Sequence, residues 1–371
     1  TVDFNWTFTP PVATLSREWF GARWTGFITA PASGVRRLGV SADDGYRLYV
    51  DGRSALDRRA KVSGGVRMID VSFAPGSRHR VRLEYSVSRG DGKIQLVWDT
   101  TRADRWKADI DSAVRVVRGS GAAVIVAGIE EGEFRDRAWL RLPGHQEELI
   151  RAVAATGVPV TVVLVGGSAI TMSDWIDRVG AVVDAWYPGD AGGTAVTDVL
   201  FGDVDPGGRL PITFPQEEGQ LPLVYDHEPT GRGDDYVDLS GQPLFPFGFG
   251  LSYTTFAYGG LQIGPTTIDS GGVATVRCTI TNTGTLAGDE VVQLYLRPDV
   301  STAVQPVIRL AGFQRVHLPP GGSREVSFTL GPEQLRVVDA RAQRVLEPGK
   351  VAVMIGASSR DIRLRGELTV Q

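Results

Sequence analysis

The sequence is poor in cysteine, in long apolar runs and in clustered positive charge. Cys278 is the single cysteine among 371 residues, so no disulfide can form within the chain. No apolar run approaches the ~20 residues that a membrane-spanning helix needs. No block of lysine and arginine offers the charge that nucleic acid binding uses. We therefore expect neither a membrane nor a nucleic acid as a partner.

The remaining composition is that of an ordinary globular protein. Hydrophobic residues make up 42% and charged residues 22% of the chain, and the net charge is −4. A chain of 371 residues has room for two or three domains. It begins with Thr1 and no signal peptide is visible there, so we expect a processed or excised piece. The compartment stays open, with a secreted or periplasmic location preferred over the cytoplasm.

Residues 1 to about 105 are predicted to form an antiparallel β-sandwich or barrel. Short segments alternate apolar and polar residues, and clusters of Gly, Asp, Pro and Ser separate them. The turn sequences Asp43-Asp44-Gly45 and Asp51-Gly52 bracket one of these segments.

The middle of the chain, from about 105 to 250, alternates apolar runs with amphipathic segments. We predict helices over 105–117, 146–155 and 194–201, and strands over 122–127, 158–165, 180–186 and 209–214. Strands and helices in alternation indicate crossover connections and a parallel sheet with helices on both faces. The glycine-bounded run at 122–127 predicts a fully buried strand.

An acidic cluster follows this first strand. Its charged residues are Glu130, Glu131, Glu133, Arg135, Asp136 and Arg137. Open α/β sheets bind ligands on the loops that leave the carboxyl ends of their strands, so the cluster is a candidate site. The alternative interpretation is a solvated acidic loop that forms ion pairs with its own arginines.

The last part of the chain, about 257 to 371, returns to short alternating strands. Seven or so strands in about 110 residues predict an immunoglobulin-like sandwich. Nothing in this part offers paired catalytic groups, so its expected role is to pack against the α/β part.

Several motifs in the middle of the chain occur in a characteristic order. They are Asp136-Arg137, Leu142-Pro143-Gly144-His145-Gln146, Trp186-Tyr187-Pro188-Gly189, Leu200-Phe201-Gly202-Asp203, Pro206-Gly207-Gly208-Arg209-Leu210-Pro211 and Phe245-Pro246-Phe247-Gly248-Phe249-Gly250. With them, residues 121 to 256 resemble the α/β-sandwich domain of glycoside hydrolase family 3, the β-glucosidase and β-xylosidase family. The last part similarly resembles the fibronectin type III-like tail of that family.

The first hundred residues carry a second set of motifs. These are Arg23-Trp24-Thr25-Gly26, the run SADDGYRLYVDG from Ser41 to Gly52, Arg82-Leu83-Glu84-Tyr85 and Gln95-Leu96-Val97-Trp98. They resemble the protective-antigen-type carbohydrate module, which in some family 3 enzymes is inserted into the sandwich domain. In some modules of this type two adjacent aspartates bind calcium and a sugar, and Asp43 and Asp44 match that pair. We prefer a turn in which these aspartates cap the backbone, and we predict neither a metal nor a cofactor.

The resemblance to family 3 implies a retaining mechanism with two carboxyl groups. The nucleophile is an Asp on a separate TIM-barrel domain, and the general acid/base is a Glu on the sandwich domain. The family often has Gly-Glu-Gly-x-Asp-Arg at that point, and the stretch from Gly132 to Arg137 lies in the same register with Phe134 in place of Gly. Glu133 is therefore the predicted general acid/base. In a second alignment frame, Glu131-Gly132 corresponds to the Glu-Gly of the family motif, and Glu131 is then the alternative. Arg135, Asp136 and Arg137 are expected to shape the loop.

The resemblance also implies that the chain has three domains and that a barrel domain, which it does not contain, is its partner. We predict a sugar module over 1–104, the α/β sandwich over 105–256 and the fibronectin type III-like domain over 257–371. No stretch shows the eight strand-helix repeats of a barrel. We thus expect the carboxyl-terminal half of a β-glycosidase, preferably a β-glucosidase, that acts on β-glycosides only with a barrel-bearing chain or domain. The alternative is a non-catalytic carbohydrate-binding or scaffold protein.

Overall fold

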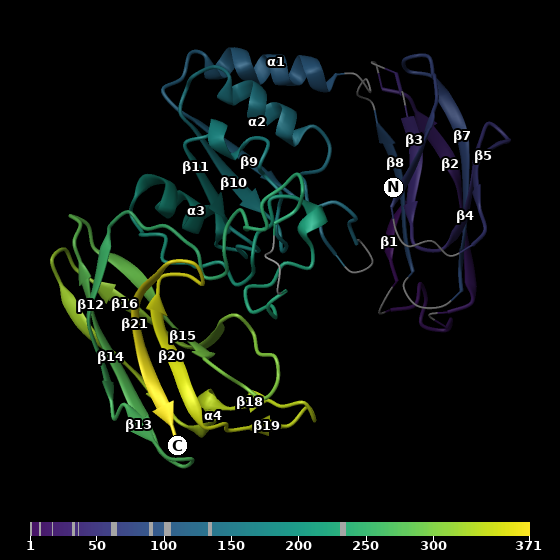
Figure 1. Cartoon of the computed structure of the whole chain (residues 1–371). Coiled ribbons are helices and arrows are strands. Elements are labelled where there is room, and N and C mark those ends of the chain that lie inside the picture. The colour runs from purple at the N-terminus through teal and green to yellow at the C-terminus, as the bar shows by residue number, and fades with distance from the viewer. Residues whose placement is uncertain are drawn as a thin grey trace. The chain divides into compact units, whose positions relative to one another are not determined.

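The computed structural model describes most of the chain (Figure 1). Residues 1, 7–8, 17, 32–33, 36, 61–64, 89–91, 100–104, 133–135 and 231–234 lie outside the description. The chain divides into two compact units. The first comprises 1–123, 130–138 and 151–158, and the second comprises 124–129, 139–150 and 159–371.

The amino-terminal part is a sandwich of two antiparallel sheets, as the alternating pattern predicts. One sheet has the order β1-β8-β3-β6 and the other β2-β7-β4-β5. The side chains that point inward from both sheets form one core, with Leu38, Leu48 and Leu83 each at most 1% exposed. The strands are β1 (Asp3–Asn5), β2 (Phe20–Thr29), β3 (Arg37–Ala42), β4 (Gly45–Val50), β5 (Arg53–Arg58), β6 (Val66–Asp70), β7 (Arg78–Val87) and β8 (Lys93–Asp99).

The middle of the chain contains a three-stranded sheet with the order β11-β10-β9. Strands β10 and β11 are parallel, with Thr161 opposite Ala181, as predicted. The elements are α1 (Trp106–Val117), β9 (Ala123–Gly128), α2 (Gln146–Ala154), β10 (Val160–Val165), the 3-10 turn Ile176–Arg178, β11 (Ala181–Asp184), α3 (Gly192–Phe201) and the 3-10 turn Glu218–Gln220. Within the described residues, no helix is both long and apolar enough to cross a membrane.

Two expectations for this part are wrong. Strand β9 is not fully buried: Val124 and Val126 are 53% and 69% exposed, because only the opposite face of the strand packs into the core. Residues 209–214 form no strand either, and only Phe214 makes a bridge, to Phe245. The reason is that Pro211, like every proline, has no N–H to donate to a strand ladder.

The carboxyl-terminal part is a second β-sandwich, again as predicted. Its sheets have the orders β12-β14-β17 and β13-β21-β20-β15-β16, and they enclose one apolar core. The elements are β12 (Phe256–Gly264), β13 (Thr267–Ile268), β14 (Ala274–Asn282), β15 (Gly288–Pro298), β16 (Arg309–Leu318), β17 (Ser323–Leu330), α4 (Pro332–Leu335), β18 (Val337–Val338), β19 (Arg344–Val345), β20 (Gly349–Gly356) and β21 (Ile362–Val370).

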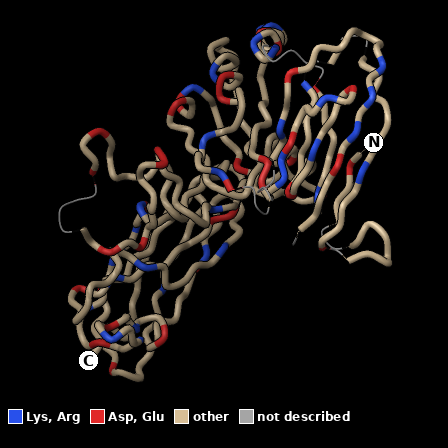
Figure 2. Tube along the Cα trace, turned by 90° about the vertical axis from the view of Figure 1, so that its right-hand side faces the viewer, with Lys and Arg blue, Asp and Glu red and all other residues tan. Residues whose placement is uncertain are grey.

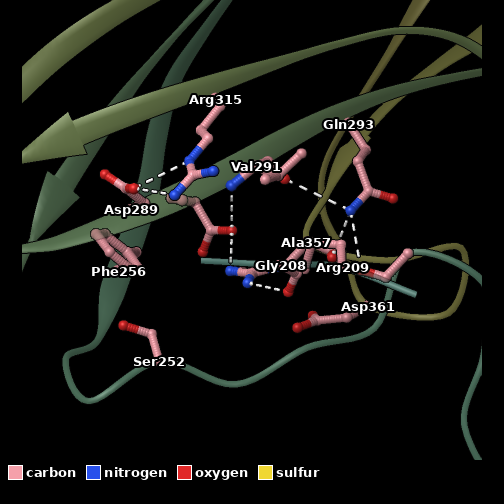
Figure 3. Close-up of polar contacts among 12 residues, drawn as sticks. Gly208, Arg209, Ser252, Phe256, Asp289, Val291, Gln293, Arg315, Ala357 and Asp361 are labelled. Atoms are coloured by element: carbon pink, nitrogen blue, oxygen red, sulfur yellow. Dashed lines mark hydrogen bonds and ion pairs between the residues drawn. The ribbon is translucent and has the colours of Figure 1, made fainter. Parts of the chain in front are cut away.

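Polar contacts join this sandwich to the segment that follows α3 (Figure 3). The Arg209 guanidinium lies 2.8 Å from Glu290 Oε1, and the two side chains are only 8% and 6% exposed. The Gln293 amide donates to the carbonyl oxygens of Gly248 (3.1 Å) and Ala357 (2.7 Å). These contacts connect chain segments far apart in the sequence and make the α/β sheet and the second sandwich parts of one compact unit.

Candidate active site

The carboxyl ends of the three parallel-sheet strands lie side by side. Ile129 N, just after β9, donates to Val165 O at the end of β10 (3.0 Å). Gly166 N, just after β10, donates to Trp186 O beyond β11 (3.1 Å). Three loops therefore leave one edge of the sheet together, which is the position where sheets of this kind bind ligands.

The end of β9 is fixed by a close backbone approach. A Cβ atom at Gly128 would lie 2.1 Å from Val165 O, so only glycine fits there. The side chain of Gln146, the first residue of α2, then binds both polar groups of the Gly128 backbone. Gly128 N donates to Gln146 Oε1 (2.8 Å), and Gln146 Nε2 donates to Gly128 O (2.9 Å) and to Pro143 O (3.1 Å). We call this pair of contacts to Gly128 the Gln146 clamp.

The acidic loop begins directly after this clamp. Glu131 and Arg137 form an ion pair of 3.7 Å, with side chains 18% and 20% exposed, so part of the alternative, self-paired loop is present. The Asp136 side chain is exposed. Glu133 and Arg135 lie outside the described residues, and the assignment of Glu133 as the acid/base, with Glu131 as the alternative, stays a prediction.

Asp184 is a titratable group at the same edge that the sequence did not single out. It ends β11, and Trp186 N donates to its Oδ1 (3.3 Å). Burial disfavours its charged form and raises the pKa of the carboxyl to about 6, while the Trp186 hydrogen bond lowers it by less. The only sequence signal was that Asp184 closes an apolar run.

A second group of carboxylates surrounds the segment that leads from the acidic loop to α2. Glu218 Oε1 accepts from Leu140 N (2.7 Å), and Glu147 Oε1 accepts from Leu142 N (3.3 Å). The pKa of Glu217 is raised, first by partial burial and then by repulsion from Glu218. These residues are far apart in the sequence, so no local motif could have predicted the group.

Asp43 and Asp44, the weak calcium candidates, use their oxygens within the protein. Asp43 Oδ1 accepts from Tyr85 Oη (2.9 Å) and from Lys93 N (2.8 Å). Asp44, which is 2% exposed, accepts from Gly45 N (3.0 Å) and from Ser88 N (2.7 Å). Among the described residues no cluster of three or more metal-binding side chains occurs. The two aspartates accept hydrogen bonds from backbone N–H groups, as predicted. One of these groups, Gly45 N, belongs to their own turn, and the others, Ser88 N and Lys93 N, lie next to β7 and in β8.

The fold and these loops define a class of protein in which an α/β domain is combined with β-sandwich domains. Residues 17–253 match the glycosyl hydrolase family 3 C-terminal domain. Residues 290–359 match the fibronectin type III-like domain. The chain belongs to glycoside hydrolase family 3, and its last sandwich is the fibronectin type III-like domain of that family.

Similar proteins and a similar crystal structure extend this finding. The chain is 40% identical, over 74% of its length, to a β-xylosidase of Formosa agariphila, and covers 40% of that protein. It is 34% identical, over 97% of its length, to a β-glucosidase of Rhizobium radiobacter, and covers 48% of it. The crystal structure of the Kluyveromyces marxianus β-glucosidase in complex with glucose matches the whole chain with a TM-score of 0.80 at 25% identity, and 47% of that chain is covered. The chain thus spans less than half the length of these relatives.

Proposed function

We propose that this chain is the carboxyl-terminal part of a retaining β-glycosidase, of the β-glucosidase type, and that Glu133 is its general acid/base. The observation that carries the proposal is the acidic loop that starts at the Gln146 clamp, in a chain that belongs to family 3. A scaffold that fixes the start of a loop is what a proton donor needs, because donation requires hydrogen-bond reach of the leaving oxygen.

Two carboxyl groups share the chemistry in this proposal. Glu133 protonates the glycosidic oxygen as the bond to the sugar breaks, and then takes a proton from the water that hydrolyses the glycosyl-enzyme intermediate. The nucleophile is an Asp on a barrel domain outside this chain, about 5–5.5 Å from the acid, as retention requires. Glu131 is the alternative acid/base, and its carboxylate lies 3.7 Å from the Arg137 guanidinium.

The first sandwich is proposed to be a protective-antigen-type module over 1–104, followed by the α/β domain over 105–256 and the fibronectin type III-like domain over 257–371. We propose that the module forms a wall of the site on the leaving-group side. Deleting residues 1–99 from the complete enzyme is then expected to change the ranking of aglycones more than the affinity for the released sugar. An unchanged ranking would reject this role.

The acid/base assignment is tested by leaving-group dependence in the complete enzyme. Glu133→Ala is expected to abolish most turnover of alkyl glycosides and to spare activated aryl glycosides, which need no proton in the first step. Azide is expected to restore turnover and to give a glycosyl azide. Glu130→Ala, next to the clamp, is the matched control and should behave as wild type. If Glu131→Ala shows the acid/base signature and Glu133→Ala does not, the second frame is correct.

The proposal that the acid/base and the nucleophile lie on different domains is tested with the 371-residue chain alone. We expect no hydrolysis of an aryl β-glucoside, since the second carboxylate and most sugar contacts belong to the barrel. Turnover that disappears in Glu133→Gln would contradict this expectation. Recovery of activity on adding the barrel-bearing part would exclude the non-catalytic alternative.

A further inference from the structure

One face of the sheet β2-β7-β4-β5 has a depression of about 490 Å³. Its floor is a row of small residues in register across three strands: Gly21 and Gly45 both lie opposite Ser86. A Cβ atom at Gly45 would lie 2.9 Å from Ser86 Oγ and from Arg59 O, so a larger residue there would displace its neighbours. The hollow therefore results from the choice of small residues in a continuous sheet.

Two residues further along the same strands, the row becomes charged. Arg23 and Arg47 both lie opposite Glu84, and the period of two places them on the same face as the small residues. Arg23 Nε is 3.1 Å from Glu84 Oε1, and Arg47 Nε is 3.4 Å from Oε2. Arg82 Nε lies 3.5 Å from the same carboxylate. The single carboxylate of Glu84 thus lies near three guanidinium groups, and the net charge of these four side chains is positive.

The other side of the depression is also basic. Arg58 and Arg59 line it, and Arg59 is paired with Asp57 of β5 at 3.0 Å. The four arginines of the wall therefore outnumber the two carboxylates, Glu84 and Asp57, that pair with them. The whole of residues 1–99 has 15 basic and 10 acidic side chains, a net charge of +5, while the complete chain carries −4. Figure 2 shows the basic residues spaced along the strands of this sandwich. The depression is therefore a local positive site in an acidic protein.

The arginines retain donors for a further ligand. The contacts of Arg23 and Arg47 with Glu84 use Nε, and a guanidinium has five N–H donors in all. Their side chains remain 66% and 41% exposed. Guanidinium groups bind carboxylate, sulfate and phosphate oxygens in pairs, which fixes the orientation of the ligand as well as attracting it.

We propose that this depression, which we call the arginine pit (Gly21, Arg23, Gly45, Arg47, Glu84 and Ser86), binds an acidic saccharide through the carboxylate of a uronic acid residue. The anionic group follows from the excess of arginine, and the saccharide class rests on the proposed function of the chain. The volume is in the range of about 300–1,000 Å³ that small-molecule sites occupy. A single pit suits one charged sugar ring better than the continuous groove that a nucleic acid strand requires.

The test is a calorimetric titration of the full chain with tetragalacturonate, and with cellotetraose as the neutral counterpart of the same length. We expect the acidic tetramer to bind and the neutral one not to bind, and the affinity to fall as salt rises. Arg47→Gln is expected to weaken binding about tenfold, as loss of a charged anchor does. Glu84→Gln is expected to strengthen binding, because the competing carboxylate is removed.

Arg37→Gln is the matched control. Arg37 is a strand arginine of the other sheet, also 41% exposed and paired with a carboxylate, Asp70, at 3.7 Å. If Arg37→Gln weakens binding as much as Arg47→Gln, attraction is only to the net charge of the sandwich and the pit is not a site. If sodium sulfate competes at equal concentration, the saccharide class is wrong. Both outcomes are independent of whether Glu133 is the acid/base, because that is measured by turnover.

Discussion

Two clusters of arginine and glutamate in this protein have the same chemistry and opposite surroundings. Between the α/β part and the last sandwich, Arg209 and Glu290 face each other at 2.8 Å with side chains 8% and 6% exposed. In the arginine pit, Arg23 and Glu84 are 3.1 Å apart, but the arginine is 66% exposed. The first cluster is enclosed by protein and its partners are fixed, whereas the second remains open to ions and ligands.

The comparison shows that burial, and not the ion pair itself, decides what such a pair does. A buried pair contributes little net stability when both partners are present, but removing one partner leaves an uncompensated charge. An exposed pair is screened by water and salt, so its members can change partners at small cost. The degree of burial should therefore rank the effects of substitution.

The largest effect is expected at Arg209. Arg209→Met leaves Glu290 buried without its cation and is expected to cost about 3–5 kcal/mol of the free energy of unfolding, measured by urea denaturation. The double variant with Glu290→Leu should recover most of this loss. If the single variant costs less than about 1 kcal/mol, the cluster behaves like an exposed pair and the comparison fails.

A smaller effect is expected at the half-buried Gln146 clamp. Gln146→Leu leaves the N–H and C=O of Gly128 without partners, which costs about 1–3 kcal/mol. In the complete enzyme the turnover of poor leaving groups should fall more than that of activated aryl glycosides, because the loop that carries Glu133 loses its fixed start. The control is Glu148→Ala on the same helix, whose contact with His145 is exposed, and which should stay within about 0.5 kcal/mol.

A pH-dependent effect is expected at Asp184. Its pKa is raised from 3.8 to about 6 in the folded protein, so the folded state binds the proton more tightly than the unfolded state. Stability should therefore fall as pH rises from about 4 to about 6 and stay level above that. Asp184→Asn should remove this decline, and the exposed Asp177→Asn should leave it unchanged. A wild-type melting temperature that does not fall between these pH values would contradict the expectation.

Asp289 is expected to have the opposite effect on the pH dependence of stability. Partial burial raises the pKa of its carboxyl, but hydrogen bonds from Arg315 and His317 outweigh this and lower it below the usual value. Its contribution is therefore present above about pH 4 and is lost as pH falls through the folded pKa. Asp289→Asn should flatten the acid side of the profile only.

The smallest effect on stability is expected in the arginine pit. Arg23→Gln removes an exposed contact with Glu84, and exposed pairs contribute about 0–1 kcal/mol. The same variant should weaken binding of tetragalacturonate in the titration described above. A melting temperature as low as that of Arg209→Met would show that the pit is a structural element.

Sequence patterns predicted the two sandwiches and the parallel strands because each short apolar run has one dominant period. They failed where neighbouring parts of the fold, and not the local sequence, determine burial and strand pairing. The run at 122–127 has the composition of a buried strand, but Val124 and Val126 face solvent, since composition does not say what covers a face. The 209–214 segment has strand-like residues, but Pro211 interrupts any ladder.

The candidate site was predictable only in part, for the same reason. The acidic loop could be located because it follows an apolar run and resembles a family motif. The clamp could not, because nothing in the sequence says that the side chain of Gln146 turns back to Gly128. The carboxylates around Leu140 and Leu142 come from chain segments of different regions, which leave no local pattern. Asp184 is marked in the sequence only as the residue that closes an apolar run.

The Gln146 clamp also has a consequence for the order in which the protein folds. Its two partners are 18 residues apart, whereas Arg209 and Glu290 are 81 residues apart. Short-range contacts close with less loss of chain entropy and tend to form before long-range ones. We therefore expect substitutions at Gln146 to slow refolding and substitutions at Arg209 mainly to speed unfolding. The chain between Gly128 and Gln146, which contains the acidic loop, would then be closed before the last sandwich packs against the α/β part.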